Sequence, residues 1–136
     1  MKAKLFLRMA SILMLLHTAG HTIGACTWNQ APNAAVKQVI DGMLSNRFEF
    51  MGRSASIADF YQGYGYGMIG VLLMITTVLW LLSTEPSPRI VLVFGLFLLF
   101  FGIIEFIYFF PLAAGFSLLA GIATLLAYRQ LLTTKI

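Results

Sequence analysis

Residues 90–110 read IVLVFGLFLLFFGIIEFIYFF, and this stretch decides the class of fold. Apart from Glu105 and Tyr108 it is apolar, and it is as long as the ~20 residues with which an α-helix crosses a bilayer. Pro111 follows at once. Because proline lacks the N–H that would continue a helix, it separates this run from the next one as a tight hairpin. The stretch therefore predicts a membrane-spanning helix that turns back directly into another.

Three further apolar runs accompany this one. The chain has 136 residues, of which 60% are hydrophobic and 10% charged, and its mean hydropathy is +0.88. Soluble domains carry about 25% charged residues, so this is the composition of a membrane protein. We expect spans at about 5–24, 59–82, 90–110 and 112–132, within a single integral membrane domain over 1–136. The predicted fold is all-α, a four-transmembrane-helix bundle in a lipid bilayer.

The basic residues orient the predicted bundle. They lie at the start of the first span, between the second and third, and at the end of the fourth: Lys2, Lys4, Arg8, Arg89, Arg129 and Lys135. Positive residues favour the cytoplasmic side, so we expect both termini there, in a multi-pass protein of the cell (inner) membrane. No basic cluster is interleaved with aromatic residues, which argues against binding of nucleic acid.

The long connection after the first span predicts an extramembrane helix. Asn33 can cap a helix over about 34–48. Its apolar residues recur at helical spacing: Val36, Val39, Ile40, Met43 and Leu44. We interpret it as an amphipathic helix in the first (outer) connection, lying in the headgroup layer or over the bundle mouth, with Trp28 as an interfacial anchor. A lid over a substrate is the alternative. Ser54 or Ser56 can start the next helix.

The stretch HTAGHTIGAC at 17–26 permits a competing interpretation of the first span. A basic start, an apolar core and IGAC are typical of a secretory signal with a lipoprotein cleavage site at Cys26. Arg8 interrupts that apolar core and two histidines occupy its end. We therefore favour an uncleaved spanning helix. As the single cysteine, Cys26 cannot form an internal disulfide.

Polar and small residues fall on single faces of the predicted spans. The fourth span carries a stripe that should face the bundle interior: Ala113, Ala114, Ser117, Ala120, Gly121 and Thr124. In the first two spans, the pairs Gly20/Gly24 and Gly63/Gly67 have the spacing that lets helices approach closely. At 1.5 Å per residue, the polar groups of three spans reach a similar depth near the outer face. We predict one ligand-binding site there: His17, His21, Asp59, Gln62, Tyr66, Glu105 and Tyr108.

Glu105 is central to this site because an unpaired charge inside a bilayer costs at least ~2.5 kcal/mol. At its depth, His17 and His21 are the cationic candidates. A histidine–glutamate pair can serve as a structural staple in an accessory protein. It can also bind a small lipophilic molecule in a pocket with aromatic walls. The expected walls are Tyr66, Phe101, Phe106 and Tyr108.

Two chemical alternatives stay open for the same residues. The pair can act as acid and base on a lipid, as in an isomerase-like enzyme. His17 and His21 stand one helical turn apart and can ligate a metal ion together with Glu105, although the glutamate of an H-E-x-x-H motif is absent. Nucleophilic catalysis has little support, since no serine lies in a G-x-S-x-G elbow. The sequence does not identify a cofactor, and self-association or a membrane partner stays open.

Three stretches resemble a family of short, uncharacterised bacterial four-helix membrane proteins: LFLRMASILMLLHTAGHTIGA (5–25), FEFMGRSASIADFYQGYG (48–65) and IEFIYFFPLA (104–113). HTAGHTIGA and DFYQGYG are the most specific of these motifs. The resemblance implies a small integral membrane protein of bacterial origin. It supplies no activity, cofactor or catalytic residue.

Overall fold

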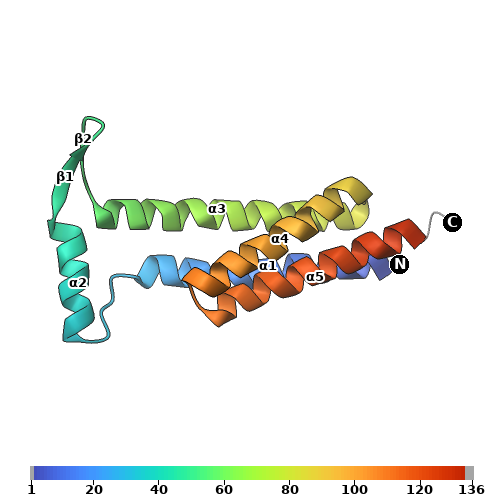
Figure 1. Cartoon of the computed structure of the whole chain (residues 1–136), viewed down its shortest axis with the longest axis horizontal. Coiled ribbons are helices and arrows are strands. Elements are labelled where there is room, and N and C mark those ends of the chain that lie inside the picture. The colour runs from blue at the N-terminus through green and yellow to red at the C-terminus, as the bar shows by residue number, and fades with distance from the viewer. Residues whose placement is uncertain (1, 134–136) are drawn as a thin grey trace. The chain divides into compact units, whose positions relative to one another are not determined.

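A computed structural model describes residues 2–133 of the chain. The elements, in order, are α1 (Lys2–Thr27), α2 (Ala34–Ser45), β1 (Arg47–Phe50), β2 (Arg53–Ser56), α3 (Ile57–Thr84), α4 (Pro88–Tyr108) and α5 (Pro111–Thr133) (Figure 1). This confirms the all-α class. The helices α1, α3, α4 and α5 are each long and apolar enough to cross a bilayer. The chain is therefore a multi-pass membrane protein.

Two compact units make up the chain. The helical unit comprises Met1–Ala19 and Val71–Ile136, and the hairpin unit comprises Gly20–Gly70. Helices α1 and α3 contribute residues to both units. Each unit has its own set of side-chain contacts, which are described separately below.

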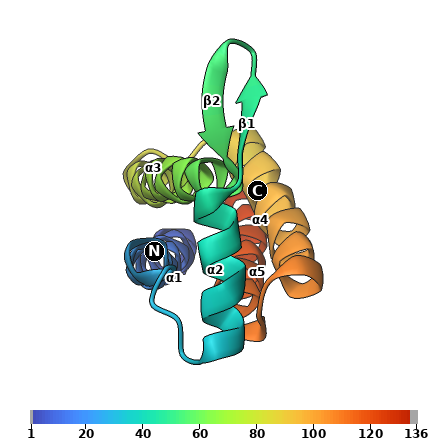
Figure 2. The ribbon, with the colours of Figure 1, turned by 90° about the vertical axis from the view of Figure 1, so that its left-hand side faces the viewer.

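In the helical unit, α4 and α5 pack side by side as an antiparallel hairpin (Figures 1 and 2). Glycines allow the close approach. A Cβ atom on Gly102 would lie 2.7 Å from the Leu118 side chain, and one on Gly121 would lie 2.9 Å from the side chain of Leu99. The predicted small-residue stripe of α5 is confirmed, because all six of its members are buried.

The prediction for the glycine pairs of the first two spans is wrong. Within the hairpin unit, no atom lies within 4 Å of a Cβ placed on Gly20, Gly24, Gly63 or Gly67. The glycines in close contact are instead those of the α4–α5 hairpin, where Gly95 and Gly102 are seven residues apart. A spacing of seven residues brings small residues to one helix face as well as a spacing of four does. A search for pairs four residues apart does not detect it.

In the hairpin unit, α2 starts as predicted and ends earlier. The Asn33 side chain accepts a hydrogen bond from the Val36 amide at 2.9 Å, which confirms the cap. The expected extent over 34–48 is wrong at its end, because Asn46 caps the helix C-terminus through a backbone bond to the Gly42 carbonyl. Ile40 is the buried residue of α2, while Val39 is 63% exposed.

Residues 47–56 form an antiparallel β-hairpin that the sequence analysis missed (Figure 2). Phe50 pairs with Arg53, so the loop consists of Met51 and Gly52 alone. Both have positive φ, 51° for Met51 and 80° for Gly52, as a type I′ turn requires. Type I′ turns favour Asn-Gly, Asp-Gly or Gly-Gly and not methionine at the first position. Gly52 was therefore the one residue in the sequence that pointed to this turn.

Candidate functional site

His17 of α1 and Glu105 of α4 form a buried pair in the helical unit. The His17 Nε2 and Glu105 Oε1 atoms lie 3.2 Å apart, and each side chain is 6% exposed. The buried face of α1, which includes Leu7, Met14 and His17, positions the imidazole. Glu105 lies on the buried face of α4 with Gly95, Leu98 and Gly102. This contact joins two predicted site residues that are 88 positions apart in the sequence.

Ser117 of α5 completes the cluster. Its Oγ lies 3.2 Å from Nδ1 of His17, so both ring nitrogens of His17 face a polar partner. Ser117 is fully buried. The rings of Phe101 and Phe116 stack against the imidazole, with centroid distances of 6.4 and 6.1 Å. Two aromatic side chains therefore pack next to the imidazole of the cluster.

One oxygen of the cluster has no protein partner. Glu105 Oε2 is buried and makes no hydrogen bond among the described residues. Leaving such an acceptor unsatisfied in an apolar interior costs ~1–3 kcal/mol, and more when the group is charged. The Oε2 atom of Glu105 is thus a hydrogen-bond acceptor that the described residues leave unsatisfied.

The hydrogen-bond chain has a consistent proton arrangement. With Glu105 as carboxylate and His17 as imidazolium, the Nε2–H donates to Oε1 and the Nδ1–H donates to the Ser117 hydroxyl. Moving one proton between the imidazole and the carboxylate changes the charges of both groups and leaves their sum unchanged. The cluster can therefore hold or exchange a proton without placing an uncompensated charge in the membrane.

His21 has a different environment. Its Nε2 lies 3.0 Å from the Gly65 carbonyl oxygen of α3, within the hairpin unit, and it is less buried than His17. Nearby, Trp28 packs on Tyr61 with ring centroids 5.2 Å apart. His21 therefore ties the end of α1 to the start of α3.

The remaining predicted residues have local partners or are exposed. Asp59 and Ser56 form a reciprocal cap at the start of α3, in which the carboxylate accepts from the Ser56 amide at 2.9 Å. Ser56 is thus the residue that starts this helix. The Gln62 side chain donates to the Tyr66 hydroxyl at 2.9 Å, and Tyr108 is 74% exposed.

The metal set His17, His21 and Glu105 stays a prediction. Among residues 2–133, no group of three or more His, Cys, Asp and Glu side chains lies close enough together to hold a metal ion. His17 would also have to give up a protein partner, since each of its ring nitrogens already has one. Cys26 is exposed and is no member of the cluster.

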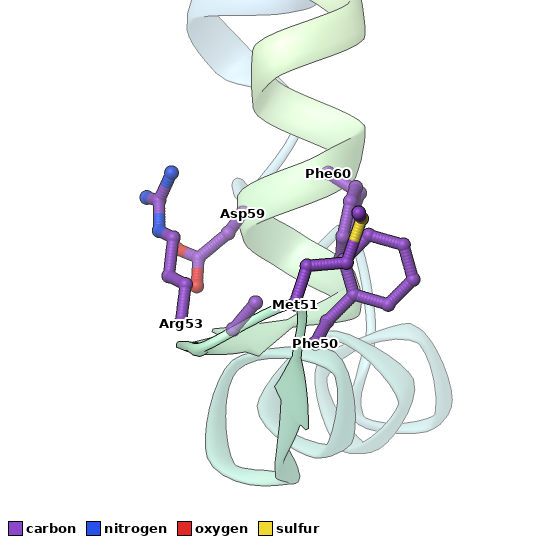
Figure 3. Close-up of a pocket in the computed structure, with 6 residues that line it drawn as sticks. Phe50, Met51, Arg53, Asp59 and Phe60 are labelled. Atoms are coloured by element: carbon purple, nitrogen blue, oxygen red, sulfur yellow. The ribbon is translucent and has the colours of Figure 1, made fainter.

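A second hollow lies at the β-hairpin, where a pocket of about 300 Å³ has six lining residues: Phe50, Met51, Arg53, Ala55, Asp59 and Phe60. Figure 3 shows Arg53 and Asp59 on one side and the rings of Phe50 and Phe60 with Met51 on the other. The Phe50 and Phe60 rings meet edge to face at 5.5 Å. Asp59 already caps α3 and contacts Arg47 at 3.4 Å, so its role here is structural.

Comparison with known proteins finds no relative, since no protein family, curated protein or solved structure matches this chain. The class that fold and site define is a multi-pass membrane protein with a buried His–Glu–Ser cluster. Sequence reasoning named His17 and Glu105 and missed the role of Ser117. The signal for Ser117 was its place on the small-residue stripe of α5, as a hydroxyl among alanines.

Proposed function

We propose that this chain binds a small lipophilic molecule with a polar head at the His17–Glu105–Ser117 cluster. The observation that carries the proposal is the buried, unpartnered Oε2 atom of Glu105. A ligand hydroxyl would donate to this oxygen and remove its desolvation cost. The apolar part of the ligand would pack against the aromatic residues that stack on the imidazole, Phe101 and Phe116.

The proposal includes a place in the cell. We infer a bacterial inner-membrane protein with both termini in the cytoplasm, related to the short four-helix family that its motifs resemble. The distribution of charged residues supports the orientation. The sequence of the helical unit carries six basic and two acidic residues, whereas the hairpin unit carries three of each. The basic residues begin α1 and α4 and end α5, which the positive-inside rule assigns to the cytoplasmic side.

A second candidate function is acid–base catalysis on the bound molecule. The specific observation in its favour is the continuous chain from Ser117 through His17 to Glu105, with 3.2 Å at each step. Such a chain can take a proton from one carbon of a lipid and return one to another. Binding is the primary proposal because it needs only the unpartnered Oε2 acceptor of Glu105.

The test is an inventory of molecules that co-purify with the full-length protein. The chain is purified in mild detergent without metal-affinity resin, extracted with organic solvent and analysed by mass spectrometry. We expect a lipophilic molecule in near-stoichiometric amount with the wild type and much less with Glu105→Leu. The matched control is Thr124→Val, which removes a buried hydroxyl that bonds only to its own helix at the Ala120 carbonyl.

The outcomes separate the alternatives. An extract with no enriched molecule, or equal amounts from wild type and Glu105→Leu, contradicts the binding proposal and favours a structural or accessory role. Stoichiometric metal in the same sample, found by elemental analysis, favours the metal alternative. Conversion of the extracted molecule by wild type, lost in Glu105→Gln while binding persists, favours catalysis. Circular dichroism of each variant checks that the helices are intact.

A further inference from the structure

Arg8 is a cation inside a spanning helix. It lies six residues beyond Lys2 in α1, which places it about 9 Å along the helix at 1.5 Å per residue. Its guanidinium carbon lies 5.0 Å from the ring centroid of Trp80 in α3. Among the described residues, no carboxylate pairs with Arg8, and its buried Nε atom has no hydrogen-bond partner.

The contact with Trp80 offsets part of the cost of this charge. A cation–π contact contributes ~0.5–2 kcal/mol, against ~2.5–3.5 kcal/mol for an arginine at the centre of a spanning helix, a cost that falls towards the helix end near which Arg8 lies. The guanidinium has five N–H donors that match the oxygens of a phosphate group. A phosphate group can therefore supply the anionic partner that Arg8 lacks among the described residues.

A groove beside Arg8 leads along the same helix face. It has a volume of about 260 Å³, and α1 and α3 each contribute three lining residues: Ser11, Ile12, Leu15, Thr76, Thr77 and Trp80. Ser11 and Ile12 lie one turn beyond Arg8 and Leu15 lies two turns beyond it, so all four share one face of α1. Trp80 contacts Arg8 and also lines the groove.

The polarity of the groove changes along its length. The Thr76 Oγ1 atom is buried without a partner, and the neighbouring Ser11 hydroxyl donates to the Thr76 carbonyl at 2.8 Å. Ile12 and Leu15 follow as apolar residues, 50% and 49% exposed. The volume is below the ~300–1,000 Å³ of pockets for drug-sized ligands. The groove therefore suits one alkyl chain next to a small anionic head better than a ring system.

We propose that this groove binds an anionic phospholipid, with its phosphate at Arg8 and an acyl chain along Ile12 and Leu15. Charge complementarity favours a lipid over a protein partner, since this end of the helical unit also carries Lys2, Lys4 and Arg89. Basic residues at the end of a spanning helix attract anionic headgroups at ~1 kcal/mol per residue. The site is independent of the His17–Glu105 cluster.

The test measures lipid binding by native mass spectrometry of the full chain in detergent. Phosphatidylglycerol is titrated against wild type, Arg8→Gln and the charge-matched control Arg89→Gln. We expect Arg8→Gln to weaken the tightest lipid about ten-fold, as loss of one charge-assisted contact predicts. Arg89→Gln should have a smaller effect. Phosphatidylcholine with the same acyl chains should bind more weakly than phosphatidylglycerol to wild type.

A second variant keeps the charge and fills the groove. Leu15→Trp should also reduce phosphatidylglycerol binding while leaving Arg8 unchanged, so that a folding defect in one variant does not decide the result. Equal losses in Arg8→Gln and Arg89→Gln would overturn the proposal in favour of diffuse surface charge. Equal binding of the two lipids, or full displacement of phosphatidylglycerol by inorganic phosphate, would overturn it in favour of an unspecific chain site or a free-phosphate site.

Discussion

Among single residues, His17 and Glu105 form the buried ion-pair contact of the helical unit. The two side chains come from helices that are distant in sequence, and both are almost fully buried. Replacing a buried ion pair by apolar residues is often neutral or stabilising, whereas removing one partner leaves an uncompensated polar group. Each of the two side chains therefore depends on the other to offset the cost of its own burial. Apolar core residues have no such mutual dependence.

This dependence predicts a strongly non-additive mutant cycle. His17→Leu should lower the free energy of unfolding by ~3–5 kcal/mol because Glu105 is left without its partner. The double variant His17→Leu, Glu105→Leu should recover most of that loss. Unfolding by denaturing detergent in mixed micelles measures each value. Additive effects of the two single variants would show that the side chains do not interact.

At the scale of elements, the α4–α5 hairpin is the closely packed part of the helical unit. Gly95, Gly102 and Gly121 each lie against a leucine of the opposite helix. The backbone nitrogen of Leu118 would be 3.0 Å from a Cβ on Gly102, so a side chain there cannot be accommodated by a rotamer change alone. The helices would have to move apart, which would also disturb Ser117, the next residue towards the start of α5.

A single methyl group tests this packing. Gly102→Ala should lower the free energy of unfolding by ~1–3 kcal/mol, the range expected for overpacking of a filled interior. Gly115→Ala is the matched control, because no described atom lies within 4 Å of its Cβ and the substitution is in the same hairpin. The same detergent titration measures both. If the two variants lose equal stability, close packing at Gly102 is not the cause.

Element positions were predictable where one physical rule decided them. Apolar length located the four spans, Pro111 located the start of α5, and Asn33 located the start of α2. The end of α2 was missed because local helical spacing continues past Asn46 while the backbone enters strand pairing. The glycine contacts were missed because they depend on which helix lies opposite, and tertiary pairing is not contained in local spacing.

At the scale of the whole molecule, the sequence predicted two members of the buried cluster correctly. Charge and depth in the spans predicted a histidine partner for Glu105 and left His17 and His21 as alternatives. Ser117 could not be assigned to His17, because its contact depends on how α5 is rotated against α1. The charges of the two units are unequal, +4 against 0 in the sequence.

The proposed site depends on the direct contact of His17 with Glu105 inside the membrane. Solid-state NMR in lipid bilayers can measure the distance from an isotope-labelled histidine ring nitrogen to a labelled glutamate carboxyl carbon. His21→Gln leaves His17 as the one histidine, and Glu105→Gln identifies the carboxyl signal. We predict a strong coupling that corresponds to the 3.2 Å contact between Nε2 and Oε1 and disappears in Glu105→Gln. A histidine ring with no glutamate carboxyl within hydrogen-bonding reach would contradict the account.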